Sequence, residues 1–251
     1  MKIAPPYGYT EVVPFHKTSK VRLPRAGEAP AFVRQSNAVP VSYTEFPLVV
    51  RDYPLVFASS DQGKSFAAVA VLGMGPAENL FVSGTAWQAG VYIPAYVRRY
   101  PFCMARVDNP GAAQSTHLMC VGKEYLDADG EAMFDAGGTP ILRWHDIERL
   151  LSEYEADLGR TREMCSILAD YGVLEPFSMQ ATLPKDKCGE AMHLTGMHRV
   201  NETRLENLNA AQLKNLLRKG ILARIYMHLL SLGNFSRLLE RKAGGSKLPA
   251  T

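Results

Sequence analysis

At residues 54–57 the chain reads Pro-Leu-Val-Phe, at 61–64 Asp-Gln-Gly-Lys, and at 66–72 Phe-Ala-Ala-Val-Ala-Val-Leu. Two short apolar runs joined by turn-forming residues predict a β-hairpin. Signals of the same kind predict three more strands after this hairpin, at residues 79–82, 102–107 and 116–121. We therefore predict a first half that is rich in β-structure.

The residues before the hairpin are predicted to be mostly extended. Residues 1–40 are rich in Pro, Lys and Arg and are expected to form an extended arm. Within this arm, residues 20–23 alternate polar and apolar side chains, which is typical of an edge strand. Ser42 and Glu45 have the spacing of a capping box, and they predict a short helix that ends before Pro54.

The pattern changes to helical periodicity near residue 139. Apolar residues recur every three or four positions over residues 147–171, and Gly172 is a natural residue to follow the end of a helix. Gly159 leaves open whether this segment is one helix or two. Asn209 and Asn234 are expected to cap two of three further helices, which we predict near residues 209–219, 221–230 and 234–243.

These patterns together predict an α+β fold, in which a β-rich N-terminal half packs against an α-helical C-terminal half. A chain of 251 residues can bury a core without disulfides or metal. We assign residues 1–251 to a single domain, with an arm at 1–40, a β-rich part at 41–138, an α-rich part at 139–243 and a frayed tail at 244–251.

The composition argues against several classes of protein. The 28 basic and 25 acidic residues give a net charge of +3, so no chain-wide field indicates a nucleic-acid partner. Local basic clusters at 17–25 and 214–224 are interpreted as solvated faces and helix ends. The longest apolar run, of about ten residues, is too short to span a membrane, and no secretory signal is visible. We therefore predict a cytoplasmic protein, with buried and reduced thiols at Cys103, Cys120, Cys165 and Cys188.

Motifs that would indicate a known catalytic or cofactor site are absent from the sequence. The chain has no GxGxxG or GxxxxGK[ST] phosphate loop, no GxSxG nucleophile elbow and no HExxH zinc motif. Residues 127–130 hold only a fragment of a calcium loop and predict a plain turn. His193 and His198 could meet near Cys188 in a loop, but polar surface histidines are the simpler interpretation. We predict no metal and no cofactor.

Four segments resemble motifs of the SapC family. They read Tyr-Pro-Leu-Val-Phe at 53–57, Glu-Asn-Leu-Phe-Val at 78–82, Tyr-Ile-Pro-Ala-Tyr-Val-Arg-Arg-Tyr-Pro-Phe at 92–102 and His-Leu-Leu-Ser-Leu-Gly-Asn at 228–234. The third segment is the most distinctive of the four. With the spacing between the segments, the resemblance extends over about residues 39–241.

The resemblance implies an accessory role in handling a surface-layer protein or an outer-membrane system, because the family takes its name from an S-layer export locus. The implied partner is another protein, either envelope or export cargo or a flavoprotein encoded nearby. The family supplies no agreed catalytic residues. This chain also departs from the family pattern, since the acidic residue after Cys120 comes only at Glu124 and Asn201 replaces the usual Asp before Glu202.

The third motif contains the residues that we predict to bind a partner. Pro94 is expected to begin a short helix and Pro101 to end it, and adjacent arginines on that helix point about 100° apart. One arginine then faces inward and needs a carboxylate partner, for which Glu78 is the candidate. The other faces solvent among aromatic side chains, as in an interface hot spot or an anion clamp. The predicted binding residues are Trp87, Tyr92, Tyr96, Arg98, Arg99 and Tyr100.

Three interpretations of this motif stay open. The first is an accessory protein that recognises a partner through an Arg-aromatic surface. The second is an enzyme or enzyme subunit acting on a small-molecule or peptide carboxylate, with His228 or His193 as the general base and a polar site that includes Glu78, Asn79 and His228. The third is a rigid corner that joins sheet and helix and contains an internal Arg–Glu pair. Independently of these, His228 lies among apolar residues and can be a hydrogen-bonded core histidine. A deep pocket with an Arg and a His within about 4 Å of each other would favour the enzyme. A flat apolar patch rimmed by Arg would favour the binder.

Overall fold

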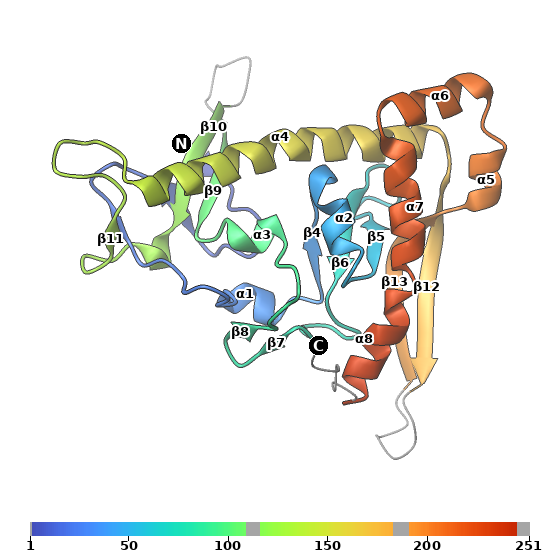
Figure 1. Cartoon of the computed structure of the whole chain (residues 1–251), viewed down its shortest axis with the longest axis horizontal. Coiled ribbons are helices and arrows are strands. Elements are labelled where there is room, and N and C mark those ends of the chain that lie inside the picture. Colours follow the sequence, from blue (N-terminus) through green and yellow to red (C-terminus); the bar gives the residue numbers. More distant parts are fainter. Residues whose placement is uncertain (1, 109–115, 183–190, 245–251) are drawn as a thin grey trace.

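The described residues fold into two larger antiparallel sheets and two two-stranded ones, a long helix that lies across the larger two, and a group of helices formed by the C-terminal quarter (Figure 1). The structure is a computed structural model, and it describes residues 2–108, 116–182 and 191–244. Sheets formed mainly by the first half, together with helices in the C-terminal part, confirm the predicted α+β class.

The predicted hairpin lies near the centre of the larger, five-stranded sheet. Its strands β5 (Leu55–Ala58) and β6 (Ala67–Val71) pair antiparallel, with Phe57 opposite Ala68. The Asp61 carboxylate accepts hydrogen bonds from backbone N–H groups across the turn, which fixes the hairpin. The order of the strands in this sheet is β12-β13-β5-β6-β4, with β4 at Ala38–Pro40.

The two longest strands of this sheet were not predicted from the sequence. They are β12 (Leu174–Thr182) and β13 (Ala191–Val200), and they come from the segment that was predicted to be rich in helix. The register between them shifts near Gly196, which has a φ of +78°. Such a bulge interrupts the polar–apolar alternation by which a strand is recognised in a sequence.

The second sheet has four strands in the order β1-β9-β10-β2. Strands β9 (Phe102–Asp108) and β10 (Thr116–Gly122) confirm two predictions, and β1 (Lys2–Ile3) and β2 (Val12–Pro14) flank them. Residues 2–40 contain short strands joined by turns and one short helix, and they pack into the molecule, since Val21 in β3 is fully buried. Strand β3 (Lys20–Val21) confirms the predicted edge strand and pairs with β11 (Glu131–Ala132).

Helix α4 (Leu142–Asp170) joins the two sheets and runs without a break through Gly159 (Figure 1). Its first turns bury Trp144 in an apolar cluster with the smaller sheet, and its last turns bury Leu168 in the core beside the larger sheet. Gly172 follows the helix with a φ of +64°, as predicted. No helix in the described ranges is both long and apolar enough to cross a membrane.

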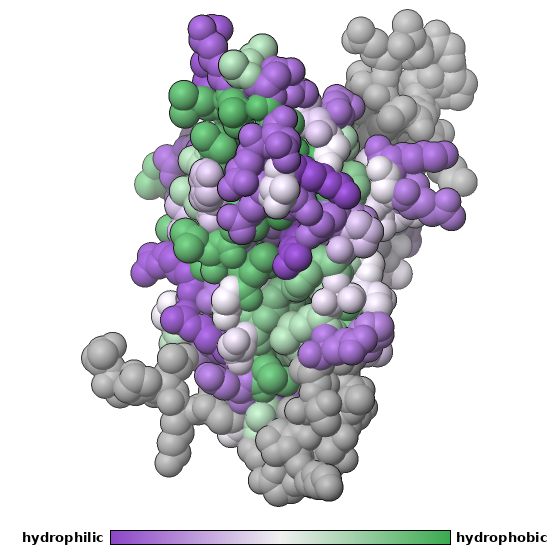
Figure 2. Space-filling model, turned by 90° about the vertical axis from the view of Figure 1, so that its right-hand side faces the viewer, coloured by the Kyte–Doolittle hydropathy of each residue, from purple (hydrophilic) through white to green (hydrophobic). Residues whose placement is uncertain are grey.

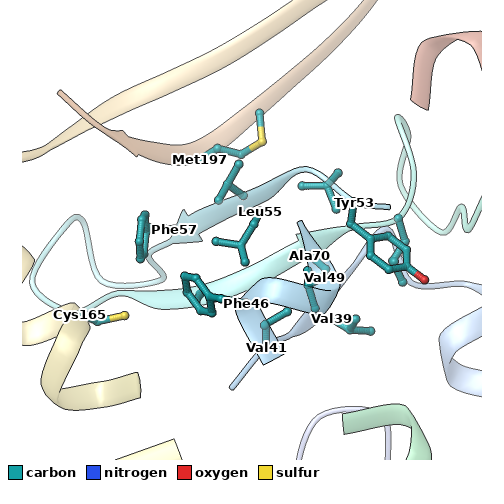
Figure 3. Packing of buried hydrophobic residues seen from close by; sticks show 14 of the residues in the cluster. Val39, Val41, Phe46, Val49, Tyr53, Leu55, Phe57, Ala70, Cys165 and Met197 are labelled. Carbon is teal, nitrogen blue, oxygen red and sulfur yellow. The ribbon is translucent and has the colours of Figure 1, made fainter. Parts of the chain in front are cut away.

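The main core lies between the larger sheet and the short helix α2 (Phe46–Val49), which follows the 3-10 turn η1 (Tyr43–Glu45). Figure 3 shows Phe46 and Val49 among the side chains of Leu55 and Phe57, with Cys165 of α4 at one edge. The predicted capping box is present, because Ser42 and Glu45 exchange hydrogen bonds at the start of η1. Burial of these apolar side chains provides most of the driving force for folding in this part of the chain.

Four helices at the C-terminus cover one side of the larger sheet. Asn209 caps α6 and Gly220 ends it in a left-handed conformation, as expected. The prediction that Asn234 caps the last helix is wrong, because Gly233 is the cap and Asn234 is the first residue of the helix. The helices are α5 (Glu202–Glu206), α6 (Ala210–Arg218), α7 (Ile221–Ser231) and α8 (Asn234–Lys242).

The predicted strand at 79–82 is wrong. The Asn79 side-chain oxygen accepts a hydrogen bond from the backbone N–H of Phe81, which bends the chain into a turn before the two-residue strand β7 (Val82–Ser83). The remaining short elements are α1 (Ala31–Arg34), β8 (Ala86–Trp87), α3 (Ala95–Arg98) and η2 (Lys123–Tyr125).

Candidate functional site

Helix α3 carries the arginine motif, and its start is held by a buried carboxylate. Pro94 immediately precedes the helix, and Pro101 follows it, as the sequence predicted. The N–H of Ala95 donates to Oε1 of Glu45, which is only 4% exposed. Because the first N–H groups of a helix have no partner inside it, this bond satisfies one of them and places α3 against η1.

The same carboxylate reaches Arg98 through one tyrosine. The Tyr92 hydroxyl donates to Glu45 (2.9 Å) and accepts from the Arg98 guanidinium (3.0 Å), and Arg98 Nε donates to the carbonyl of Ile93 (3.0 Å). Burial and the neighbouring carboxylate raise the pKa of Tyr92, so its hydroxyl keeps the proton that it donates. The Arg98 side chain is therefore exposed to solvent, but its hydrogen bonds to Tyr92 and Ile93 fix the orientation of its guanidinium.

Arg99 points the other way and is almost fully buried, with 4% of its surface exposed. Its guanidinium lies 4.2 Å from the ring centre of Tyr96 and 4.9 Å from that of Tyr154. Its carboxylate partner is Glu155 of α4, at 3.6 Å. The candidate partner Glu78 was wrong, because α4 and not the 78–82 segment packs beside α3.

Three of the predicted binding residues, the aromatic side chains Trp87, Tyr96 and Tyr100, are buried rather than exposed. Trp87 Nε1 donates to the Tyr53 hydroxyl (3.1 Å), and the hydroxyls of Tyr96 and Tyr100 donate to the Tyr7 carbonyl (2.6 Å) and to Glu124 (2.8 Å). The expectation of an exposed arginine flanked by these three rings is wrong. Apolar burial and a hydrogen-bond partner for each polar atom make them part of the scaffold.

The three residues of the predicted polar site form hydrogen bonds with separate parts of the molecule. They are Glu78, Asn79 and His228. Glu78 accepts from the N–H of Met74 and pairs with Lys242. Asn79 donates to the carbonyl of Val33 and accepts from the N–H of Phe81. Glu78 therefore bonds to the backbone of Met74 and to Lys242 of α8, and Asn79 bonds to the backbone of Val33 and Phe81. None of these groups is a partner of His228.

His228 is a hydrogen-bonded core histidine, as one interpretation of the sequence held. Its Nε2 accepts from the N–H of Val200 (3.1 Å), which leaves Nδ1–H to donate to the carbonyl of Leu55 (2.7 Å). Burial lowers its pKa from 6.5 to about 4, so the ring is neutral near pH 7. With no exposed surface, it cannot reach a substrate as a general base.

Two more residues of the C-terminal motif bind the start of β5. Ser231 Oγ accepts from the N–H of Leu55 (2.9 Å), and the Asn234 side chain donates to the carbonyls of Val50 (2.8 Å) and Tyr53 (3.0 Å). The motif at 228–234 therefore holds the motif at 53–57 in place. We refer to these contacts of His228, Ser231 and Asn234 as the β5–α7 junction.

The structure gives little support to a nucleophile or a metal ligand. Burial raises the pKa of Cys103 and Cys165 to about 12, so both thiols stay protonated. These two and Cys120 are buried and free, as predicted, and Cys188 lies outside the described residues. His193 is exposed on β13 beside Gln180 (3.2 Å). Within the described ranges, no three His, Cys, Asp or Glu side chains are grouped so that they could hold a metal ion.

A pocket of about 230 Å³ opens beside α3, between residues 23–30 and the first turns of α4. Its rim carries Arg25, Arg98 and Arg143, and the one carboxylate among the described lining residues is Glu28, which accepts from the backbone N–H of Arg25. Arg143 also pairs with Glu131 at the surface. The walls are mostly apolar and include Leu23, Pro24, Pro30, Ile93, Val97, Ile147 and Leu150.

This arginine-rimmed pocket combines apolar walls with basic side chains, which suits a ligand that has an apolar group next to an anion. Apolar walls favour the burial of a side chain, and arginine forms strong, often paired hydrogen bonds with carboxylates. Arg25 lies in the basic cluster at 17–25, which the sequence analysis treated as a solvated face. No sequence signal places that cluster near Arg98, because it is the folding of the chain that brings residues 23–30 and the arginine motif to the same pocket.

Comparison with known proteins identifies one related family. The family model described as SapC matches residues 16–238, which is nearly the whole chain. Neither the curated proteins nor the solved structures contain a match.

Proposed function

This chain belongs to the SapC family, and we propose that it is an accessory binding protein that recognises another protein through the arginine-rimmed pocket. The resemblance supports a link to the handling of surface-layer or outer-membrane proteins. On the same ground we propose envelope or export cargo, or a flavoprotein encoded nearby, as the partner. The free cysteines Cys103, Cys120 and Cys165 fit our proposal that it acts in the cytoplasm.

The observation that carries the proposal is the composition of the pocket. The site is a pocket and not a flat patch, but its apolar walls surrounded by Arg25, Arg98 and Arg143 have the composition expected of a binding protein. No histidine is among the described lining residues, and their one carboxylate, Glu28, already accepts from the backbone N–H of Arg25. A partner segment that inserts an apolar side chain and carries a neighbouring carboxylate fits both features.

The orientation of Arg98 also supports recognition. Its side chain is fixed by Tyr92 and by the carbonyl of Ile93 before any partner arrives. A long side chain that is already ordered loses less conformational entropy on binding, which leaves more of the interaction energy as affinity. Arginine is also among the residues that most often dominate binding energy at protein interfaces.

The enzyme interpretation receives less support from the geometry. His228 is enclosed in the core, and His193 lies on β13, whereas the pocket is formed by residues 23–30, α3 and α4. A general base must lie within hydrogen-bond reach of the proton that it removes, directly or through one water. Neither histidine is among the residues that line the arginine-rimmed pocket.

Recovery of the tagged chain from its native cells tests the proposal. The experiment compares the unmodified chain with Arg98→Ala and with Arg149→Ala, a control that removes another exposed arginine, on α4 and outside the pocket lining. We expect a near-stoichiometric protein to be recovered with the unmodified chain and with Arg149→Ala, and to be lost with Arg98→Ala while the fold is retained.

Two outcomes would contradict the proposal. A partner recovered equally with Arg98→Ala would show that recognition occurs elsewhere on the molecule. If every version is recovered alone, the accessory function loses its support, and binding of small carboxylates to the pocket becomes the next measurement.

A further inference from the structure

A second surface, distant in sequence from the arginine motif, leaves large apolar side chains exposed. Leu217 is 66% exposed, Tyr226 51% and Leu230 79%. Helix α7 packs against both α6 and α2, and Leu48 of α2 is also 41% exposed. These four side chains on three adjoining helices define what we call the α7 surface.

The exposed positions along α7 follow the spacing of one helix face. Ala223, Tyr226 and Leu230 are exposed at intervals of three and four residues. They form a stripe about 10 Å long at 1.5 Å per residue. Figure 2 shows the side of the molecule on which β12 and the C-terminal helices lie, where hydrophobic side chains are exposed between hydrophilic ones. A stripe of this kind matches the side of a partner helix.

The segment that forms α6, α7 and most of α8 is basic. Glu175 and Glu202 lie at its edge, beside Leu229 and Leu232, and Glu175 is paired with Arg199. Residues 207–239 contain no Asp or Glu, although the whole chain has 25 acidic residues. Lys219 is paired with Glu163 of α4, so part of this positive charge is compensated inside the molecule. The same segment contains five basic residues, Lys214, Arg218, Lys219, Arg224 and Arg237.

We propose that the α7 surface docks an amphipathic helix with an acidic polar face, supplied by another protein. The apolar side of such a helix would cover Tyr226 and Leu230. Its acidic residues would face the basic side chains of α6 and α7, and complementary charges of this kind mainly set orientation and partner choice. Exposed apolar side chains rimmed by polar ones are typical of interaction sites.

Charge and shape argue against other occupants. A second copy would bring the same basic residues to the same surface, and like charges brought together oppose association. A helix that lies in a membrane interface buries a broad apolar face in the lipid. In α7 that broad face, with Ile221 and Ile225, is already buried in the core, and only Tyr226 and Leu230 remain as large exposed side chains.

The inference is independent of the function proposed for the arginine-rimmed pocket. The two surfaces share no residue, so Arg98→Ala is expected to leave binding at α7 unchanged. Failure of one proposal can therefore be told apart from failure of the other.

Binding of a designed peptide to the whole chain tests the inference. The probe is a fluorescently labelled helical peptide with Leu on one face and Glu on the other, and the matched peptide has Lys in place of Glu. Fluorescence anisotropy compares the unmodified chain with Leu230→Glu and with Leu142→Glu, a control at an 86% exposed position at the start of α4. We expect the acidic peptide to bind, Leu230→Glu to weaken binding at least about tenfold, and Leu142→Glu to change it little.

Several results would overturn the inference. Equal binding of the acidic and basic peptides would remove the argument from charge, and equal loss in both variants would remove the argument from position. Vesicles of phosphatidylcholine and phosphatidylglycerol that bind the chain and are released by Leu230→Glu would show a membrane surface instead. Concentration-dependent dimers abolished by Leu230→Glu in sedimentation would assign the surface to self-association.

Discussion

The β5–α7 junction and the arginine-rimmed pocket are both built from the distinctive motifs of the chain, but they differ in what their polar groups contact. At the junction, His228, Ser231 and Asn234 bond to backbone groups of neighbouring elements and are buried. At the pocket, Arg98 is held by Tyr92 and remains exposed. Distinctive residues in a motif can therefore serve the fold, and the exposed ones are the better candidates for binding.

The arginine motif repeats this division between two adjacent residues. Arg99 also lines the pocket, but it is buried among tyrosine rings and pairs with Glu155, whereas Arg98 is exposed at the rim. Removing a buried partner leaves an uncompensated charge, which is costly, while exposed arginines contribute little to stability. The predictions below test whether stability depends on the buried groups and binding on the exposed one.

The largest loss of stability is expected at the junction. His228→Leu leaves the Val200 N–H and the Leu55 carbonyl without the partner that each has in the core, at a cost of about 4 kcal/mol in the free energy of unfolding. Urea unfolding measures this free energy. The exposed His145→Leu serves as the control, and an equal, small effect of both substitutions would show that the junction is not needed.

The junction is also expected to make stability depend on pH. The pKa of His228 in the folded chain is about 4, below its ordinary 6.5, so the unfolded chain binds a proton more readily. This contribution is fully present above pH 6.5 and is lost as pH falls towards 4, by about 3 kcal/mol. The difference in unfolding free energy between the unmodified chain and His228→Leu should shrink over this range; a constant difference would refute it.

A loss in both stability and binding is expected at Glu45. Glu45→Ala leaves the N–H of Ala95, two donors of Ser42 and the Tyr92 hydroxyl without their acceptor, at about 3 kcal/mol. Because Tyr92 then no longer holds Arg98, recovery of the partner should also fall. Calorimetry and co-purification measure the two effects, and normal recovery by a destabilised but folded variant would break the link from Glu45 to the pocket.

A smaller effect on stability is expected at the Tyr92 hydroxyl, which joins Glu45 to Arg98. Tyr92→Phe removes one hydrogen bond to Glu45 and one to Arg98, and should cost about 1 kcal/mol. Binding of the partner should weaken more than stability does, because the guanidinium loses its fixed orientation. Tyr43→Phe, which removes a hydroxyl bonded to the carbonyl of Lys219, is the matched control.

Local signals in the sequence predicted much of the fold. The hairpin at 54–72 and the capping box at 42–45 depend on residues close in the chain, and both are present. The β12–β13 hairpin was missed, although 177–180 alternates polar and apolar residues, because the bulge at Gly196 breaks the alternation in its partner strand. The turn at Asn79 was missed because a side chain there takes over a backbone bond that a strand would use.

The candidate site was only partly predictable for a similar reason. The sequence indicated that one of two adjacent arginines turns inward, but which one depends on the packing of α4, whose Glu155 lies 56 residues beyond Arg99. The pocket itself requires Arg25 and Arg98 to line the same cavity, and no local pattern encodes that arrangement. The type of chemistry at the candidate site could be deduced from the sequence, but the location of the site on the molecule could not.

Unfolding free energies of Arg98→Ala and Arg99→Ala, measured side by side in urea, test the central distinction most directly. We expect Arg99→Ala to lower the free energy of unfolding by about 3 kcal/mol, because it opens a cavity among tyrosine rings and leaves Glu155 unpaired. Arg98→Ala should change the free energy by less than about 1 kcal/mol. Equal losses, or a larger loss in Arg98→Ala, would contradict the assignment of Arg99 to the fold and Arg98 to recognition.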